Sequence, residues 1–158
     1  MIKIFLSIFC FLSLVSPCHA WQARVVSVTD GDTITVEPLA GGHPIKIRLH
    51  GIDAPEKNQP AGEPARGFVF EVALYQAVEV EEKYRDRYGR LVAVLHLSSG
   101  ESLQELLLKS GYAWVWPRYC RNCRDWEKLQ AEAQENERGL WANPDPVPPW
   151  EWRRGTRP

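Results

Sequence analysis

Three short β-branched segments separated by turn signals constrain this chain more than any other feature of its sequence. Residues 24–29, 33–37 and 45–50 are rich in valine, isoleucine and threonine, and they partly alternate between polar and apolar side chains. Asp30-Gly31 is a tight-turn signal between the first two segments, and residues 39–44, which contain two glycines, indicate the next turn. The pattern predicts three consecutive strands that can pair as a meander.

The hydrophobic period changes in the middle of the chain. Apolar side chains fall on one helical face between residues 65 and 73, and Pro64 suits the first turn of such a helix. Residues 77–84 return to strand character, and residues 86–89 predict a hairpin connection to a partner strand over residues 90–97. This part of the sequence therefore adds one helix and two strands.

The last third of the sequence predicts two further helices and a tail. Ser102 and Glu105 match a capping box ahead of three consecutive leucines. A short strand around residues 113–116 and a third helix over roughly residues 125–138 follow. In the segment from Asn143, the four prolines between residues 144 and 149 predict an extended tail without a helix.

Five strands interleaved with three helices in this order fit a small Greek-key barrel, for which the OB-fold is the natural candidate. We therefore expect a β-barrel with helices, of the α+β class: a five-stranded OB-fold barrel with about three helices packed outside it. The 158 residues suffice for one compact domain. We place this domain at residues 21–142, followed by a Pro/Trp-rich C-terminal tail over residues 143–158.

The first 20 residues have the pattern of a secretory signal peptide. Lys3 gives a weakly positive start, residues 4–15 are almost wholly apolar, and Cys18-His19-Ala20 offers small residues before a cut. We expect a signal peptide over residues 1–20, cleavage before Trp21, and a periplasmic or secreted protein. The apolar run is short for a membrane span, so we expect no stable membrane insertion after cleavage. A lipid anchor on the last cysteine of this segment is the weaker alternative.

The charge of the mature chain excludes one class of nucleic-acid-binding protein. Removing residues 1–20 leaves 18 Lys+Arg against 20 Asp+Glu, a net charge of −2. Proteins that coat nucleic acid through bulk charge are strongly basic. If the substrate is a polyanion, a local basic site and a metal ion must attract it.

Two cysteines remain after the signal peptide, Cys120 and Cys123. Zinc requires more ligands than this pair supplies, and no histidine stands at ligand spacing around it. No thioredoxin-like βαβ pattern surrounds the pair either. In an oxidising compartment the pair is a disulfide candidate. So short a loop gains only about 2 kcal/mol from cross-linking, so we interpret the bond as stiffening the loop.

Carboxylates cluster at the ends of two expected strands. Asp32 follows the first turn signal, and Asp53 follows the third strand. Hard cations such as Ca²⁺ bind clustered carboxylates and main-chain carbonyls, and the two residues would meet if the three strands pair as a meander. Glu56 lies just beyond them and could position or deprotonate a water molecule. The alternative is ordinary turn chemistry for the aspartates and a solvated loop charge for the glutamate.

Two arginines are candidates for binding phosphate. Arg48 lies near the end of the third expected strand, and Arg90 opens the fifth. A guanidinium can hold a phosphate through two parallel hydrogen bonds and stays charged at every physiological pH. Ordinary surface salt bridges are the alternative. Tyr88 is the best candidate for stacking on a base, because its turn should be exposed.

Three motifs, in order and at characteristic separations, resemble the staphylococcal nuclease (thermonuclease) family. They are residues 28–34, residues 47–56 and residues 86–90, which include every candidate residue named above except the cysteines. The likeness runs from about Val25 to Arg153, and the region beyond the third helix is similar to exported bacterial members. The resemblance implies an OB-fold barrel and Ca²⁺-dependent hydrolysis of DNA and RNA that leaves 3′-phosphate ends.

The resemblance also implies roles for individual residues. Asp32, Asp53 and the main-chain carbonyl of Ala54 become metal ligands, and Glu56 becomes the candidate general base. The positively charged and aromatic residues become contacts of the substrate. These are Arg48 and Arg90 as phosphate clamps, with Tyr88 and Arg87 as further substrate contacts.

Three departures from the family and two rival functions accompany this prediction. Ala54 stands where the family often has threonine, and residues 58–61 lack the lysines of the namesake. A second tyrosine contact of the namesake aligns poorly with residues 116–119 and is not assigned. We expect a monomeric, metal-dependent phosphodiesterase. The alternatives are a non-catalytic nucleic-acid-binding OB-fold module and a structural domain whose carboxylates only form turns.

Overall fold

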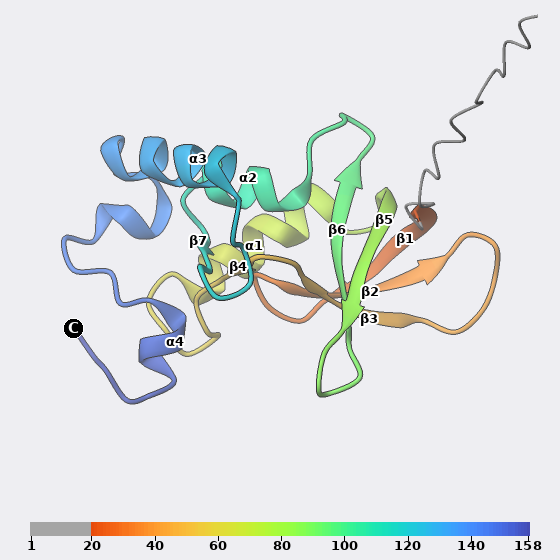
Figure 1. Ribbon diagram of the computed structural model, residues 1–158, viewed down its shortest axis with the longest axis horizontal. Helices are drawn as coiled ribbons and strands as arrows, with labels where there is room; N and C mark the ends of the chain where they lie inside the picture. Colours follow the sequence, from red (N-terminus) through yellow and green to blue (C-terminus); the bar gives the residue numbers. More distant parts are fainter. Residues whose placement is uncertain (1–19) are drawn as a thin grey trace, which may run out of the picture.

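The computed structural model describes residues 20–158, and a closed β-barrel forms its centre (Figure 1). The expected signal peptide lies outside the described residues, apart from Ala20, which begins the first strand. The barrel order is β1-β2-β3-β6-β5. Its strands are β1 (Ala20–Val28), β2 (Thr33–Pro38), β3 (Ile45–Leu49), β5 (Ala77–Arg85) and β6 (Leu91–Leu97). The expected five-stranded barrel of the OB type is confirmed.

The first three strands pair as the antiparallel meander that the sequence predicts. Val28 pairs with Ile34 across the tight turn, and Thr33 pairs with Arg48 on the neighbouring strand. The main-chain N–H of Leu49 donates to the carbonyl of Asp32 at 2.8 Å, which ties the turn to the end of β3. The meander therefore places Asp32 beside Arg48.

One parallel pairing closes the barrel on its other side. Arg48 of β3 pairs with Val92 of β6, and all other neighbouring strands are antiparallel. Residues 91–95 of β6 are all apolar and are buried on both faces of the strand. The reason is that β6 is flanked by two barrel strands and also contacts a helix outside the barrel.

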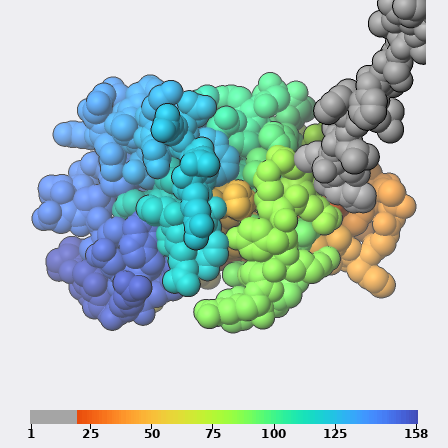
Figure 2. Space-filling view, viewed as in Figure 1, coloured from red at the N-terminus to blue at the C-terminus, as the bar shows by residue number. Residues whose placement is uncertain are grey.

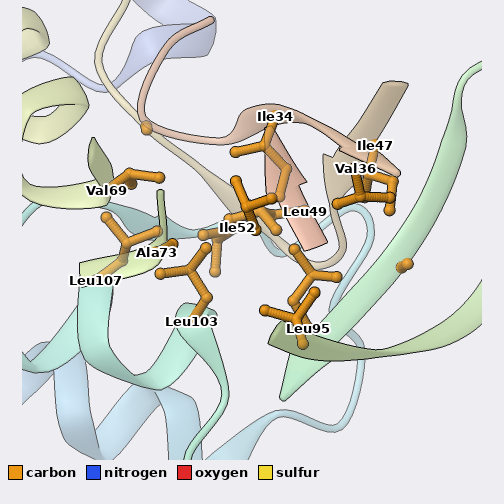
Figure 3. Close-up of a cluster of buried hydrophobic side chains, with 14 of the residues drawn as sticks. Ile34, Val36, Ile47, Leu49, Ile52, Val69, Ala73, Leu95, Leu103 and Leu107 are labelled. Atoms are coloured by element: carbon orange, nitrogen blue, oxygen red, sulfur yellow. The ribbon is translucent and has the colours of Figure 1, made fainter. Parts of the chain in front are cut away.

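Helices cover one end and one side of the barrel (Figure 1). The α-helices are α1 (Gly62–Ala73), α2 (Leu103–Lys109), α3 (Arg124–Glu135) and α4 (Pro149–Trp152). The capping box expected at Ser102 is present, because its hydroxyl accepts from the N–H of Glu105 while the Glu105 carboxylate accepts from the N–H of Ser102. Apolar residues of α1 and α2 meet the barrel strands in one core (Figure 3).

The sequence does not predict the exact ends of the third helix. Helix α3 ends at Glu135, and a 3-10 helix, η1 (Gly139–Ala142), follows it. Glu137 and Gly139 both have positive φ angles, of 52° and 55°, which cannot continue a right-handed helix.

A second, two-stranded sheet lies beside the barrel. It pairs β4 (Ile52–Asp53) with β7 (Trp114–Val115), so that Asp53 stands opposite Trp114. A disulfide between Cys120 and Cys123 follows β7, with their Cα atoms 5.6 Å apart. Because β4 comes directly after β3, this sheet fixes the carboxylate of Asp53 near the end of the barrel.

The prolines of the tail predicted an extended chain without a helix, and this prediction is wrong. Residues 149–152 form α4, a single helical turn that begins at Pro149, and this helix rests near β7 and the loop that follows it (Figure 1). Proline is compatible with the first helical position because the N–H it lacks would have no partner there. No helix among residues 20–158 is long and apolar enough to span a membrane.

Candidate active site

Asp32, Arg48 and Asp53 meet at the end of the barrel. One guanidinium nitrogen of Arg48, Nη2, lies 3.0 Å from Oδ2 of Asp32 and 2.7 Å from Oδ1 of Asp53. The two carboxylates therefore face one point in space, although Asp32 belongs to the β1–β2 turn and Asp53 to strand β4. The sequence predicted that these aspartates would meet if the first three strands pair as a meander. The strands do pair in this way.

The Arg48 guanidinium is fixed on its other side by main-chain oxygens. Its Nη1 donates to the carbonyls of Leu49 at 3.2 Å and Ile52 at 3.1 Å. The side chain is 12% exposed. Because these two carbonyls and the two carboxylates are fixed in position, the planar Arg48 guanidinium has one orientation, in which its Nη2 bridges both aspartates.

Burial opposes ionisation of both aspartates. Loss of hydration raises the pKa of Asp32 to about 7, with Arg48 opposing the rise and the charges of Asp30 and Asp53 adding to it. Burial also raises the pKa of Asp53, against the stabilising effect of hydrogen bonds and charges from Arg153 and Arg48. A divalent cation would favour the charged form of both carboxylates.

The donor set fits a hard cation. Oδ2 of Asp32 accepts from the main-chain N–H of Ala54 at 2.7 Å, which places the Ala54 segment beside the aspartates. Within residues 20–158 no group of three His, Cys, Asp or Glu side chains could hold a metal ion. A cation here would therefore be bound by the two carboxylates together with main-chain oxygen and water, as Ca²⁺ accepts.

Gly31 makes the close approach of these segments possible. A Cβ atom at this position would lie 2.7 Å from Cβ of Ala54 and 3.0 Å from Cβ of Ala65. The tight-turn glycine thus also packs the first turn against the Ala54 segment and helix α1. Any larger residue would push Asp32 away from Ala54.

Glu56 lies on the loop between β4 and α1. Its main-chain N–H donates to Oε1 of Gln59 at 3.1 Å, and the buried Gln59 side chain donates to the carbonyl of Val147 at 2.5 Å. The Glu56 carboxylate is partly exposed and lies 2.6 Å from Nη1 of Arg153. The loop is therefore closed by a hydrogen bond of its own and held by the C-terminal tail through Gln59 and Glu56.

Changing Gly62 to alanine should displace the Glu56 loop. The new Cβ would overlap the main-chain carbonyl oxygen of Glu56, which cannot move independently of its loop. We expect a loss of about 1–3 kcal/mol in the free energy of unfolding, measured by urea denaturation. Gly67→Ala is the matched control on the same helix, because its Cβ would meet no atom within 4 Å. It should raise stability by up to about 1 kcal/mol through helix propensity, and equal destabilisation by both changes would contradict this prediction.

The β5–β6 hairpin carries the remaining predicted residues. Nε of Arg90 lies 2.7 Å from Oδ2 of Asp86, and Nη2 of Arg87 donates to the hydroxyl of Tyr88 at 2.6 Å. The Tyr88 ring is 68% exposed and lies under both guanidinium groups. Among the described contacts, the carboxylate partner of Arg90 is Asp86, and no hydrogen bond or ion pair joins Arg90 to Asp32, Asp53 or Glu56. The structure thus groups Arg87, Tyr88 and Arg90 together on the hairpin.

Arg153 is a site residue that the sequence analysis missed. Its Nη2 lies 2.7 Å from Oδ2 of Asp53, and its Nη1 lies 3.3 Å from Oδ1 of the same carboxylate. These atoms belong to residues 100 positions apart, and no local spacing connects them. Arg153 does fall in the tail segment that resembles exported nucleases, but that likeness assigns it no role.

Comparison with known proteins decides the family. Residues 46–143 match the family model described as staphylococcal nuclease homologue. A protein of Escherichia coli named an uncharacterized endonuclease is 38% identical over 136 residues, which cover 86% of this chain and 87% of that protein. The chain belongs to the staphylococcal nuclease family. The family resemblance drawn from the three motifs is therefore confirmed.

Further relatives within the staphylococcal nuclease family carry enzyme names. The protein of Shigella flexneri named micrococcal nuclease is 34% identical over 157 residues, 91% of this chain and 88% of that protein. The Arabidopsis thaliana protein named staphylococcal-like nuclease CAN1 is 37% identical over 112 residues, which cover 71% of this chain and 34% of that protein. The family and these names indicate a nuclease, that is, a hydrolase.

Proposed function

We propose that this chain is a Ca²⁺-dependent nuclease that hydrolyses phosphodiester bonds in DNA and RNA and leaves 3′-phosphate ends. The observation that carries the proposal is the meeting of Asp32, Asp53 and Arg48 at one point, with Glu56 joined to Asp53 through Arg153. Membership of the staphylococcal nuclease family supports the same reaction. We further propose that the protein acts as a monomer after export to the periplasm or the medium.

The cation site would consist of Asp32, Asp53 and the main-chain carbonyl of Ala54. When bound, Ca²⁺ would offset negative charge on a phosphate oxygen and polarise the phosphoryl group. With a cation bound, the two buried carboxylates would carry their charge at a place where water is largely excluded. Their contribution is to position that charge in advance of the reaction.

Hydrolysis needs a base for water and cations for the phosphoryl group. Glu56 would accept a proton from the attacking water, whose oxygen bonds to phosphorus as the bond to the 5′-oxygen breaks. Arg48 would hold the phosphoryl oxygens, and Arg90 would hold a phosphate oxygen or support the leaving 5′-oxygen, which takes up a proton. This bond cleavage leaves the phosphate on the 3′ side, as proposed.

The hairpin offers a surface for the rest of the substrate. Tyr88 is the largest exposed ring close to Arg90, and the neighbouring Arg87 adds positive charge. A base could stack on the ring while the guanidinium groups face the phosphates. Arg90 directly precedes β6, and Arg48 lies on β3, which pairs with β6. The two arginines are therefore held by adjacent strands of the barrel.

The test is cleavage of a labelled single-stranded oligonucleotide by the purified mature protein across a range of free Ca²⁺ concentrations. We expect activity that follows Ca²⁺, disappears with a chelator and yields products ending in 3′-phosphate, which a 3′-phosphatase converts to 3′-hydroxyl. Equal cleavage in chelator would contradict the metal dependence. Ca²⁺-dependent binding of the oligonucleotide without any cleavage would favour the non-catalytic OB-fold module instead.

A further inference from the structure

The C-terminal tail places a positive charge on two residues of the proposed catalytic site. The Arg153 guanidinium lies 2.7 Å from Oδ2 of Asp53 and 2.6 Å from Oε1 of Glu56. Oδ1 of Asp53 is shared between Arg48 at 2.7 Å and Arg153 at 3.3 Å. Both oxygens of this carboxylate therefore have a guanidinium partner.

Burial distinguishes this contact from an ordinary surface ion pair. The side chain of Asp53 is only 1% exposed, whereas that of Arg153 is 39% exposed. A buried carboxylate without a cationic partner is strongly unfavourable, while an exposed pair contributes little. Asp53 thus needs compensating charge in the absence of a metal ion, and Arg153 supplies part of it.

The tail holds Arg153 in place through contacts of its own. The Trp150 ring is stacked on Trp116, with centroids 6.2 Å apart and planes 8° from parallel. The carbonyl of Val147 accepts from the Gln59 side chain, and Pro149 is buried. In space-filling view, the tail lies against the segment that follows β7 (Figure 2). The tail therefore keeps Arg153 close to Asp53 at a high local concentration.

We propose that Arg153 is a tethered counter-ion of the cation site, which neutralises Asp53 and Glu56 in the metal-free protein and leaves Asp53 when a divalent cation binds. The inference rests on the proposed function, because it takes Asp53 as a metal ligand. A guanidinium and a divalent cation repel each other and use the same carboxylate oxygens. Binding of one therefore opposes binding of the other, and the tail lowers the affinity for the cation.

The Trp116 ring offers the Arg153 guanidinium an alternative contact when it leaves Asp53. It already lies 5.4 Å from the centroid of the Trp116 ring, a favourable position for a cation over an aromatic face. The half-exposed side chain can rotate towards this ring and solvent without undocking α4. The competition therefore involves one side chain and leaves the fold intact.

The test is isothermal titration calorimetry of Ca²⁺ into the full mature chain without nucleic acid, for the wild type, Arg153→Gln and Arg154→Gln. Arg154 is exposed and adjacent in sequence, and its side chain has no ion pair or hydrogen bond among the described contacts. If Arg153 occupies the site about nine-tenths of the time, removing it should tighten Ca²⁺ binding about tenfold. Arg154→Gln removes the same charge nearby and should change the affinity by no more than about twofold.

The outcomes separate this inference from the proposed function. Tighter binding by Arg153→Gln alone supports the tethered counter-ion. Wild-type affinity in Arg153→Gln, or equal tightening in both variants, overturns it and leaves the Ca²⁺ site in place. Absence of Ca²⁺ binding in all three proteins overturns the metal-dependent function and this inference together. If Arg153→Gln does not fold, hydrogen exchange of the Arg153 side chain in the wild type decides: its guanidinium N–H protons should exchange faster with Ca²⁺, and unchanged exchange of these protons at saturating Ca²⁺ overturns the inference.

Discussion

Replacing Glu56 by glutamine should lower kcat for oligonucleotide cleavage by about 10²–10⁴-fold, with little change in KM. Glutamine has nearly the same shape and can still meet the Arg153 guanidinium, but it cannot accept a proton from water. The loop itself should stay in place, because Gln59 binds the main chain of Glu56 and not its carboxylate. Single-turnover rates at saturating Ca²⁺ measure the chemical step directly.

The matched control for this change is Glu63→Gln on helix α1. Glu63 is an exposed carboxylate whose charged neighbours, Arg66 and Lys57, lie 3.7 and 4.0 Å away. Its replacement removes the same charge close to the site and should leave kcat within about twofold of the wild type. Comparable losses in the two variants would mean that Glu56 acts only through the local electrostatic field and not as a base.

Replacing Arg48 by lysine should lower kcat by about 10²–10³-fold, even though the charge is kept. The ammonium group cannot reproduce the four contacts that Arg48 makes with the two aspartates and the carbonyls of Leu49 and Ile52. Acceptors left unpaired in this largely buried place should also reduce the free energy of unfolding by about 1–3 kcal/mol. Rates on a defined oligonucleotide and urea denaturation measure the two effects separately.

Arg66→Lys provides the comparison for the Arg48 change. Arg66 is on α1, its side chain is 38% exposed, and its ion pair with Glu63 spans 3.7 Å. The substitution should change stability by less than about 0.5 kcal/mol and leave activity intact. If Arg48→Lys behaves in the same way, the fixed orientation of the guanidinium has no part in the reaction.

The meander and its consequence for the site could be predicted from sequence because both depend on neighbouring residues. The β-branched runs and the Asp30-Gly31 turn specify which strands pair, and the Thr33–Arg48 pairing then brings Asp32 to the end of β3. The capping box at Ser102 is equally local. In each case the interacting groups lie within one turn or on consecutive strands.

Other features depend on contacts between distant segments, which sequence patterns do not encode. Pairing of β4 with β7 rests on Asp53 meeting Trp114, and the tail docks because Trp150 stacks on Trp116. The prolines of the tail indicated an extended chain, but the docked position permits a helical turn that begins at Pro149. Arg153 could not be placed in the site without knowing that the tail returns to it.

The parallel pairing of β3 with β6 has a consequence for synthesis and folding. Val92 and Arg48 are far apart in the chain, as are the paired Val78 and Ala23 that close the barrel elsewhere. Contacts of such long sequence separation form slowly, because a large loop must first be ordered. A nascent chain that ends before β6 can form the meander but cannot complete the barrel end that carries both aspartates. The growing polypeptide would thus be harmless to the nucleic acids of the cell that makes it at least until β6 has been translated.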